Sequence, residues 1–324
     1  TPLEALVDKL GSDCVTFSQG YMASRPMFDR ADVISQSVAD SLYNAAIEEA
    51  RKADLVIFMG GLNKNYQQDC EGEDRRAYEL PYGQDRLIEG LLKANKKLVV
   101  VLTSGNAVAM PWLKEVPSLV QSWYLGSIGG KALADVLLGE VTPSGKLPFS
   151  YPAKLEDCPA HYYGELSYPG DSIRQEYKED ILVGYRWYDT KHIQPLFPFG
   201  YGLSYTQFEY GKPVISACEM KDDDVLEIRC SVKNVGDVAG KETVQLYIGD
   251  EKCRVLRPVK ELKDFYKVAL QPGEEREIVF TVDKEDLTFF DDQLHDWVAE
   301  PGKFKAYIGS SSQDIRGVVE FELN

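Results

Sequence analysis

Apolar residues in the first 150 positions alternate between two spacings, one typical of amphipathic helices and one of buried strands. The helical spacing predicts helices over residues 2–10, 38–53, 83–95 and 129–139, and a short one over 111–116. Short apolar runs predict strands over residues 13–17, 54–61, 97–105 and 118–126. This alternation predicts a doubly wound, mainly parallel α/β sandwich over residues 1–160, whose ligands bind where the carboxyl ends of the strands meet.

The pattern changes twice in the remainder of the chain. Residues 161–211 are rich in Tyr, Pro and Gly and have little periodicity, as expected of a linker that is functional or wrapped on a neighbouring surface. Residues 212–324 contain short alternating segments separated by turn residues. Such segments predict an antiparallel β-sandwich of about seven strands.

Composition narrows the class of protein. The 324 residues include 52 acidic and 36 basic side chains, a net charge of −16, which argues against general binding of nucleic acid. No apolar run approaches the ~18 residues of a membrane span. The chain has only three histidines, which argues against a His-rich metal site. Its six cysteines are too sparse for a disulfide framework.

The segment from Gly60 to Gln84 follows the predicted strand 54–61 and therefore lies on the ligand-binding edge. It concentrates charge in four acidic residues followed by two arginines: Asp69, Glu71, Glu73, Asp74, Arg75 and Arg76. One interpretation is a solvated charged loop. The other is a general acid/base carboxyl. Neighbouring carboxylates raise the pKa of such a group, and neighbouring arginines lower it. The residues alone leave both open.

Several ordered motifs resemble those of glycoside hydrolase family 3. DCEGEDR followed by ELPYGQ resembles the family's ExEGxDR…LPxxQ stretch, and VLTSGNAVAMPWL resembles its strand and Met-Pro-Trp segment. SWYLG, GGKALADVLLGEVTPSGKLPFSYP, VGYRWYD and PLFPFGYGLSYTQFEY resemble its later motifs. VKNVGDVAGKETVQLYI, RPVKELKDFYKVAL and PGKFKAYIGSSS are similar to a fibronectin type III-like domain.

This resemblance implies a retaining exo-β-glycosidase, similar to a β-glucosidase, that acts without a cofactor on terminal non-reducing β-linked sugars. Its substrates would be β-linked oligosaccharides or aryl and alkyl glycosides. The family's general acid/base falls on Glu71. Asp69 stands where the family often has Glu. Asp69, Asn65 and Tyr66 are the candidates for substrate contact.

The family's nucleophile is an Asp on a preceding (β/α)₈ barrel, which this sequence does not contain. The family also has a strand before the helix at residues 2–10. We therefore expect this portion to act with a barrel portion, in cis or as a second chain, and to be inactive alone. Glu71 is expected to project into a sugar-sized hollow that the barrel completes. Substrates of this class imply a periplasmic or secreted enzyme.

Two other functions remain open, a non-catalytic carbohydrate-binding module and a scaffold for assembly. Trp112, Trp123 and Trp187 are interpreted as core residues rather than sugar platforms. The basic residues Lys252, Arg254, Arg257, Lys260 and Lys263 are interpreted as a solvated strand face.

Overall fold

The computed structural model describes residues 1–23, 34–65, 67–72 and 74–324. These residues form two compact units, Thr1–Glu140 and Val141–Asn324, which are described separately. The predicted boundaries at residues 160 and 211 stay predictions. No helix of the described ranges is long and apolar enough to cross a membrane.

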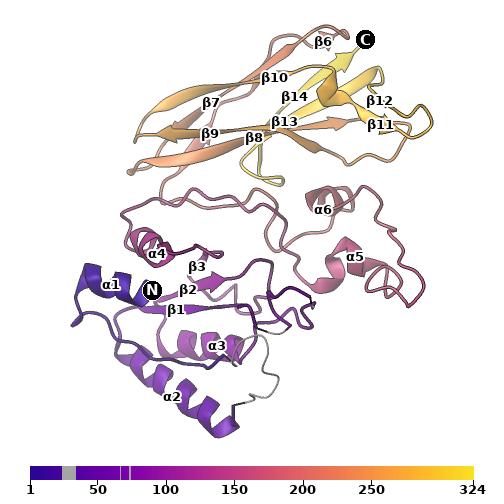
Figure 1. The fold of residues 1–324 in the computed structure, drawn as a ribbon. Helices are drawn as coiled ribbons and strands as arrows, with labels where there is room; N and C mark the ends of the chain where they lie inside the picture. The colour runs from indigo at the N-terminus through magenta and orange to yellow at the C-terminus, as the bar shows by residue number, and fades with distance from the viewer. Residues whose placement is uncertain (24–33, 66, 73) are drawn as a thin grey trace. The chain divides into compact units, whose positions relative to one another are not determined.

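The first unit is built on a parallel sheet in the order β1-β2-β3. Its strands are β1 (Val56–Gly61), β2 (Leu98–Thr103) and β3 (Ser118–Gln121). Its helices are α1 (Pro2–Leu10), α2 (Gln36–Lys52), α3 (Gln84–Ala94) and α4 (Gly129–Leu137). Figure 1 shows α2 and α3 on one face of the sheet and α1 and α4 on the other. The predicted α/β class is confirmed.

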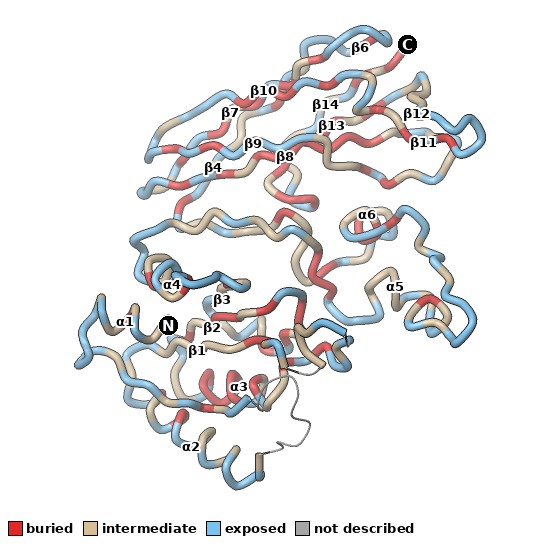
Figure 2. Tube along the Cα trace, viewed as in Figure 1, coloured by how far each residue is buried: buried red, intermediate tan, exposed pale blue. Residues whose placement is uncertain are grey.

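Local sequence explains where two of these helices begin. The Thr1 side chain accepts from the backbone N–H of Glu4 in a capping box, and Pro2 occupies the first helical turn of α1. The Ser35 side chain caps α2 by accepting from the N–H of Val38. Helix α3 packs against β1 and β2, its residues Leu87 and Leu91 are buried, and Figure 2 shows α3 and β2 as largely buried.

Two predicted elements are absent from this unit, and each has a physical reason. Residues 13–17 form a turn followed by irregular chain instead of a strand, because no neighbouring strand pairs with them in the described structure. Residues 111–116 form turns with bonds such as Leu113 N–H to Met110 O (3.1 Å). A six-residue segment gains too few bonds to offset helix nucleation.

The second unit contains the predicted antiparallel β-sandwich. One sheet has the order β10-β7-β4 with β5 beside β7, and the other has the order β6-β14-β13-β8-β9. The strands are β4 (Phe208–Tyr210), β5 (Val214–Ile215), β6 (Glu219–Met220), β7 (Leu226–Asn234), β8 (Gly240–Asp250), β9 (Glu261–Leu270), β10 (Glu275–Val282), β13 (Gly302–Gly309) and β14 (Ile315–Leu323). A hairpin of β11 (Phe289–Asp291) and β12 (Asp296–Val298) completes the unit. Among the described strands of the second unit, only β6, which runs parallel to β14, departs from antiparallel pairing.

The aromatic segment before the sandwich packs against it within the second unit. It contains η1 (Leu155–Asp157), α5 (Pro159–Tyr162) and α6 (Tyr185–Thr190). Asp189 of α6 is buried and accepts from Lys260 Nζ at 2.7 Å and Gln313 Nε2 at 3.1 Å. The segment is therefore wrapped on the sandwich and is part of the same compact unit.

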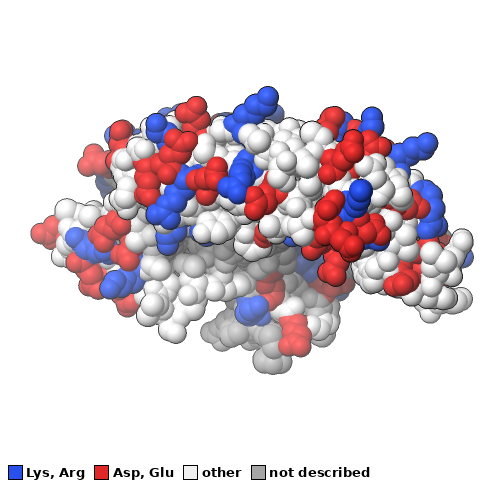
Figure 3. Space-filling view, turned by 90° about the horizontal axis from the view of Figure 1, so that it is seen from above, with Lys and Arg blue, Asp and Glu red and all other residues white. Residues whose placement is uncertain are grey.

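The interpretation of residues 252–263 as a solvated basic face is wrong for two members. The Arg257 side chain is only 8% exposed and lies 2.6 Å from Glu261. Lys260 is buried against Asp189. Both cations are buried because a carboxylate compensates the loss of hydration. Over the face that Figure 3 shows, acidic and basic side chains are interspersed.

Candidate active site

The loop that carries the acidic motif leaves β1 through two glycines. A Cβ on Gly60 would lie 2.3 Å from Gln84 Oε1, and one on Gly61 would lie 2.0 Å from the carbonyl oxygen of Thr103. Gln84 is fully buried, accepts from the Gly61 N–H (2.7 Å) and donates to the Gly61 carbonyl oxygen (2.8 Å). The first residue of α3 therefore fixes the direction in which the loop leaves the sheet.

The first part of the loop is held by Tyr82. Asn65 Nδ2 donates to the Tyr82 hydroxyl at 3.1 Å, and Gln68 Nε2 donates to the same oxygen at 2.7 Å. Asn65, predicted to contact substrate, thus has a clear structural partner. Tyr66, the neighbouring prediction, lies outside the described residues.

Asp69 joins the loop to the segments that follow β2 and β3. Its Oδ2 accepts from the Gly105 N–H at 2.6 Å and from the Tyr124 hydroxyl at 2.7 Å. Its Oδ1 accepts from Asn106 Nδ2 at 2.7 Å. Burial and the Asp69 carboxylate together raise the pKa of Tyr124 far above its usual value. Both oxygens of Asp69 are therefore engaged within the chain, and any contact with substrate would use their remaining lone pairs.

Arg75 holds the other side of the acidic tip. Its Nη1 donates to Asn106 Oδ1 at 2.7 Å, and its Nη2 donates to the carbonyl oxygen of Ala107 at 2.6 Å. Asn106 thus bridges the two residues, since it donates to Asp69 and accepts from Arg75. The two residues that flank the acidic tip, Asp69 and Arg75, are therefore tied to one side chain.

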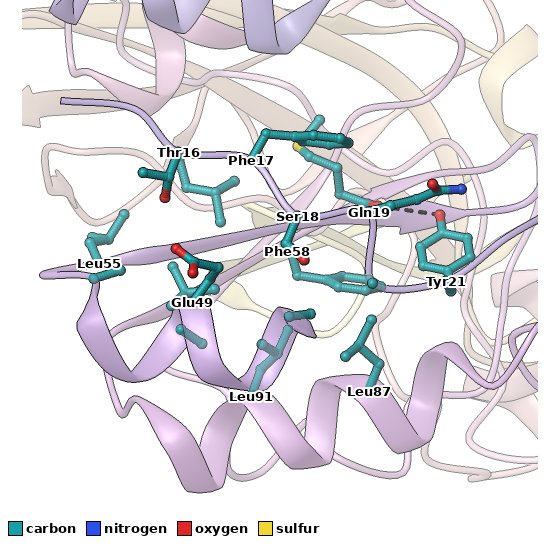
Figure 4. A pocket seen from close by; sticks show the side chains of 17 residues that line it. Thr16, Phe17, Ser18, Gln19, Tyr21, Glu49, Leu55, Phe58, Leu87 and Leu91 are labelled. Atoms are coloured by element: carbon teal, nitrogen blue, oxygen red, sulfur yellow. Dashed lines mark hydrogen bonds between the residues drawn. The ribbon is translucent and has the colours of Figure 1, made fainter. Parts of the chain in front are cut away.

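Glu71 lies at this tip, between the two tethered residues. It is exposed and forms no hydrogen bond or ion pair with the described residues. Gly72, which follows it, has φ +87°, a conformation that favours glycine. One cavity of this unit, shown in Figure 4, is lined by residues 16–21 and by β1, and a second is lined by Tyr21, Tyr82 and residues of α2 and α3. Glu71 lines neither of them. The expected sugar-sized hollow around Glu71 stays a prediction.

The tryptophans behave largely as interpreted. Trp112 and Trp187 are buried, and Trp112 Nε1 donates to Asp85 Oδ1 at 2.7 Å. Burial raises the pKa of Asp85, although its hydrogen bond from Trp112 opposes the effect. Trp123 is partly buried with φ +55°, just beyond the end of β3.

Sequence reasoning missed three residues that shape this site: Gln84, Asn106 and Tyr124. Gln84 is the last residue of the ELPYGQ motif, so its position was visible although its role was not. Asn106 follows Ser-Gly at the end of a predicted strand, where a loop residue meets the ligand edge. Nothing in the sequence connects Asn106 or Tyr124 to Asp69 before the strands are placed side by side.

Comparison with known proteins identifies the family that this fold and loop define. Residues 1–205 match the glycosyl hydrolase family 3 C-terminal domain, and residues 242–312 match the fibronectin type III-like domain. The chain belongs to glycoside hydrolase family 3, as its motifs predicted.

Several relatives of the chain are β-glucosidases of bacteria and yeast. The chain is 69% identical over 320 residues to beta-glucosidase BoGH3A of Bacteroides ovatus, covering 99% of this chain and 43% of that protein. It is 43% identical to thermostable beta-glucosidase B of Acetivibrio thermocellus, over 95% of this chain and 39% of that protein. The chain therefore spans less than half the length of these relatives.

A solved structure also resembles the chain over nearly its full length. The Bifidobacterium adolescentis GH3 beta-glucosidase superposes with a TM-score of 0.87 at 34% identity, covering 99% of this chain and 45% of that one. The Kluyveromyces marxianus beta-glucosidase in complex with glucose gives a TM-score of 0.81 at 41% identity, over 91% of this chain and 34% of that one.

Proposed function

We propose that this chain is the acid/base-bearing C-terminal part of a retaining exo-β-glycosidase that removes terminal non-reducing β-linked sugars. The observation that carries the proposal is the position of Glu71, exposed and without a partner among the described residues, between Asp69 and Arg75, which share Asn106. A carboxyl that serves only to stabilise this loop would be expected to take part in its hydrogen bonds. The β-glucosidase relatives support the substrate class.

The proposed chemistry uses Glu71 twice. As a carboxylic acid it gives its proton to the glycosidic oxygen while that oxygen leaves the anomeric carbon and a carboxylate nucleophile bonds to the same carbon. As a carboxylate it then takes a proton from water, whose oxygen attacks the anomeric carbon and releases the nucleophile. We propose that the nucleophile is an Asp on a barrel portion of the same enzyme, supplied in cis or by a second chain.

The exposure of Glu71 explains why this chain would need that portion. A general acid that keeps its proton near neutral pH needs desolvation or a nearby like charge. The chain leaves Glu71 exposed, so the surface that carries the nucleophile would supply the desolvation. We also propose that the enzyme is periplasmic or secreted, because its substrates are extracellular saccharides.

A chimera provides the direct test. This chain replaces the matching region of the Bacteroides ovatus relative, to which it is 69% identical, and hydrolysis of aryl β-glucosides is measured. Glu71→Gln should lower the rate for poor leaving groups by roughly 10²–10⁴ and spare good leaving groups more, because only poor ones need the proton. Azide should rescue Glu71→Ala with good leaving groups by attacking the glycosyl-enzyme, which gives a product of retained configuration.

A matched control comes from an exposed carboxylate near the same loop. Glu79→Gln should leave all rates close to those of the unaltered chimera, since Glu79 lies outside the Asp69–Arg75 segment. If Glu71→Gln lowered the rate of hydrolysis equally for poor and good leaving groups, the proposed role would be contradicted. Turnover by the isolated chain would contradict the need for a second portion. Saccharide binding by the isolated chain, without hydrolysis by the chimera, would favour a carbohydrate-binding module instead.

A further inference from the structure

The fourth tryptophan of the chain, Trp297, lies on the hairpin of β11 and β12 in the second unit (Figure 1). In the register of the hairpin it stands directly opposite Phe290. The two ring centroids are 5.8 Å apart, and the ring planes meet at 73°. Residues that are directly opposite share one face of a two-stranded sheet, so the hairpin presents both rings on the same face.

This aromatic pair is open to solvent. Trp297 is 65% exposed and Phe290 is 52% exposed, and Figure 2 shows the turn that joins the two strands as exposed. Single exposed apolar residues are ordinary, whereas apolar residues that lie together mark interaction sites. Because the rings meet edge to face, each ring keeps at least one flat face that the other ring does not cover.

A buried carboxylate holds the turn of this hairpin. Asp291 Oδ1 accepts from the N–H groups of Gln293 at 2.8 Å and Leu294 at 3.0 Å. The other oxygen of the buried Asp291 carboxylate forms an ion pair with Arg254, which also pairs with Glu300. The turn is therefore fixed without a ligand, and binding at the aromatic pair would cost little ordering of the backbone.

The polar side chains of the turn indicate the chemistry of a ligand. They comprise two carboxylates, an amide and an imidazole, all on exposed residues: Asp292, Gln293, His295 and Asp296. Carboxylates repel anions, which disfavours phosphate-bearing ligands and anionic membranes. They also disfavour a protein partner, because the core of a protein interface is depleted of aspartate.

A neutral saccharide fits both parts of this surface. One face of a pyranose ring consists of C–H groups, which stack on the electron-rich face of an aromatic ring. The hydroxyls at the edge of the sugar donate hydrogen bonds, and the carboxylates of the turn accept them. Aromatic rings beside carboxylates and an amide therefore favour a saccharide over the other classes of ligand.

We propose that Trp297 and Phe290 form a platform that binds a β-linked saccharide chain. A sugar unit stacks on the indole ring, and hydroxyls of the same chain donate to the carboxylates of the turn. The platform is open at its sides, so it can bind units in the interior of a chain, whereas a site that removes terminal sugars accepts only an end. The β-linked class rests on the proposed function, and the position of the platform rests on the hairpin alone.

Titration of the 324-residue chain with cellohexaose, followed by two-dimensional NMR of isotope-labelled protein, tests the proposal. The indole N–H signal of Trp297, assigned by its absence in Trp297→Tyr, should shift in a saturable way. Trp112 and Trp187 are buried, so their indole signals should not move and provide an internal control. Amide signals of residues 292–296 should shift together with Trp297.

Three variants locate the ligand. Trp297→Ala should weaken the binding of cellohexaose by at least about tenfold, which is about 1.4 kcal/mol, whereas Trp297→Tyr keeps a flat ring and should retain most of the affinity. Phe290→Ala should also weaken binding. Its matched control is Phe265→Ala, which removes a phenyl ring that is 61% exposed on β9 and should leave the affinity unchanged. Since all of these side chains are exposed, thermal unfolding should confirm that each variant folds.

An unmoved Trp297 signal at saturating solubility of cellohexaose would overturn the proposal, and so would equal binding by Trp297→Ala and the unaltered chain. A shift of the same signal with protein concentration, in the absence of saccharide, would overturn it because the pair would then join two copies of the chain. Binding that Glu71→Gln abolishes would place the ligand at the acidic tip instead. Hydrolysis by the chimera remains the test of Glu71, so failure of either proposal is distinguishable from failure of the other.

Discussion

Asn106 is the residue whose replacement best tests how the acidic tip is held. Its amide nitrogen donates to Asp69 and its amide oxygen accepts from Arg75. Asn106→Asp keeps the size of the side chain and the acceptor for Arg75. It replaces the donor with a second carboxylate that faces Asp69. The substitution should therefore release the Asp69 end of the tip and keep the Arg75 end.

The expected magnitude follows from two losses. A hydrogen bond to a charged group contributes about 1.5–3 kcal/mol, and the lower end applies because this pair is exposed. Two like charges about 4 Å apart repel by about 1 kcal/mol in water. Together these losses amount to about 2–3 kcal/mol, which is a roughly 30- to 150-fold increase in the opening equilibrium of the tip.

Amide hydrogen exchange at Asp69 and Gly105 measures that equilibrium, because the Asp69 N–H donates to the Asn63 carbonyl oxygen at 3.0 Å and the Gly105 N–H donates to Asp69 Oδ2 at 2.6 Å. Exchange should accelerate in Asn106→Asp by the stated factor at neutral pH. Added salt should reduce only the repulsive part.

The reciprocal variant gives the control. Asp69→Asn combined with Asn106→Asp restores one donor and one carboxylate across the pair, so the double variant should recover part of the loss. Equal exchange in Asn106→Asp and in the unaltered chain would refute the reasoning, because the bridge would then contribute nothing to the order of the tip.

Two further predictions concern buried carboxylates. Burial raises the pKa of Asp85, so ionisation of this carboxyl opposes folding once the pH rises through its pKa. The variant Asp85→Asn should therefore raise the midpoint of thermal unfolding at about pH 7 more than at about pH 3. Lys260→Met leaves the buried Asp189 carboxylate without its ion pair and should destabilise the second unit by about 3–5 kcal/mol in denaturant titrations, whereas Lys260→Met with Asp189→Leu should lose less.

The fold was largely predictable because its elements carry strong local patterns. The continuous apolar run of β2 is typical of a buried strand. The alternation of apolar and polar residues in β7 is typical of a strand with one buried face. The prediction at residues 13–17 was wrong for the opposite reason. A strand depends on hydrogen bonds to a neighbour, and a local pattern does not report whether that neighbour is present.

The candidate site was predictable only in part. The position of Glu71 followed from a motif, and its loop followed from the end of β1. The partners of Asp69 lie 36, 37 and 55 residues further along the chain, so they depend on the order of strands in the sheet. Lys260 was misjudged for a similar reason, since its burial depends on the distant carboxylate of Asp189. Arg257 was misjudged although the carboxylate that compensates it, Glu261, is only four residues further along the chain.

The bridge at Asn106 has a consequence for assembly. Asp69 and Arg75, which flank the tip, are both fastened to Asn106 within this one polypeptide. Ordering a flexible loop during association costs conformational entropy, which weakens the complex. For these two flanking residues that cost falls on the folding of the first unit, before any other surface docks.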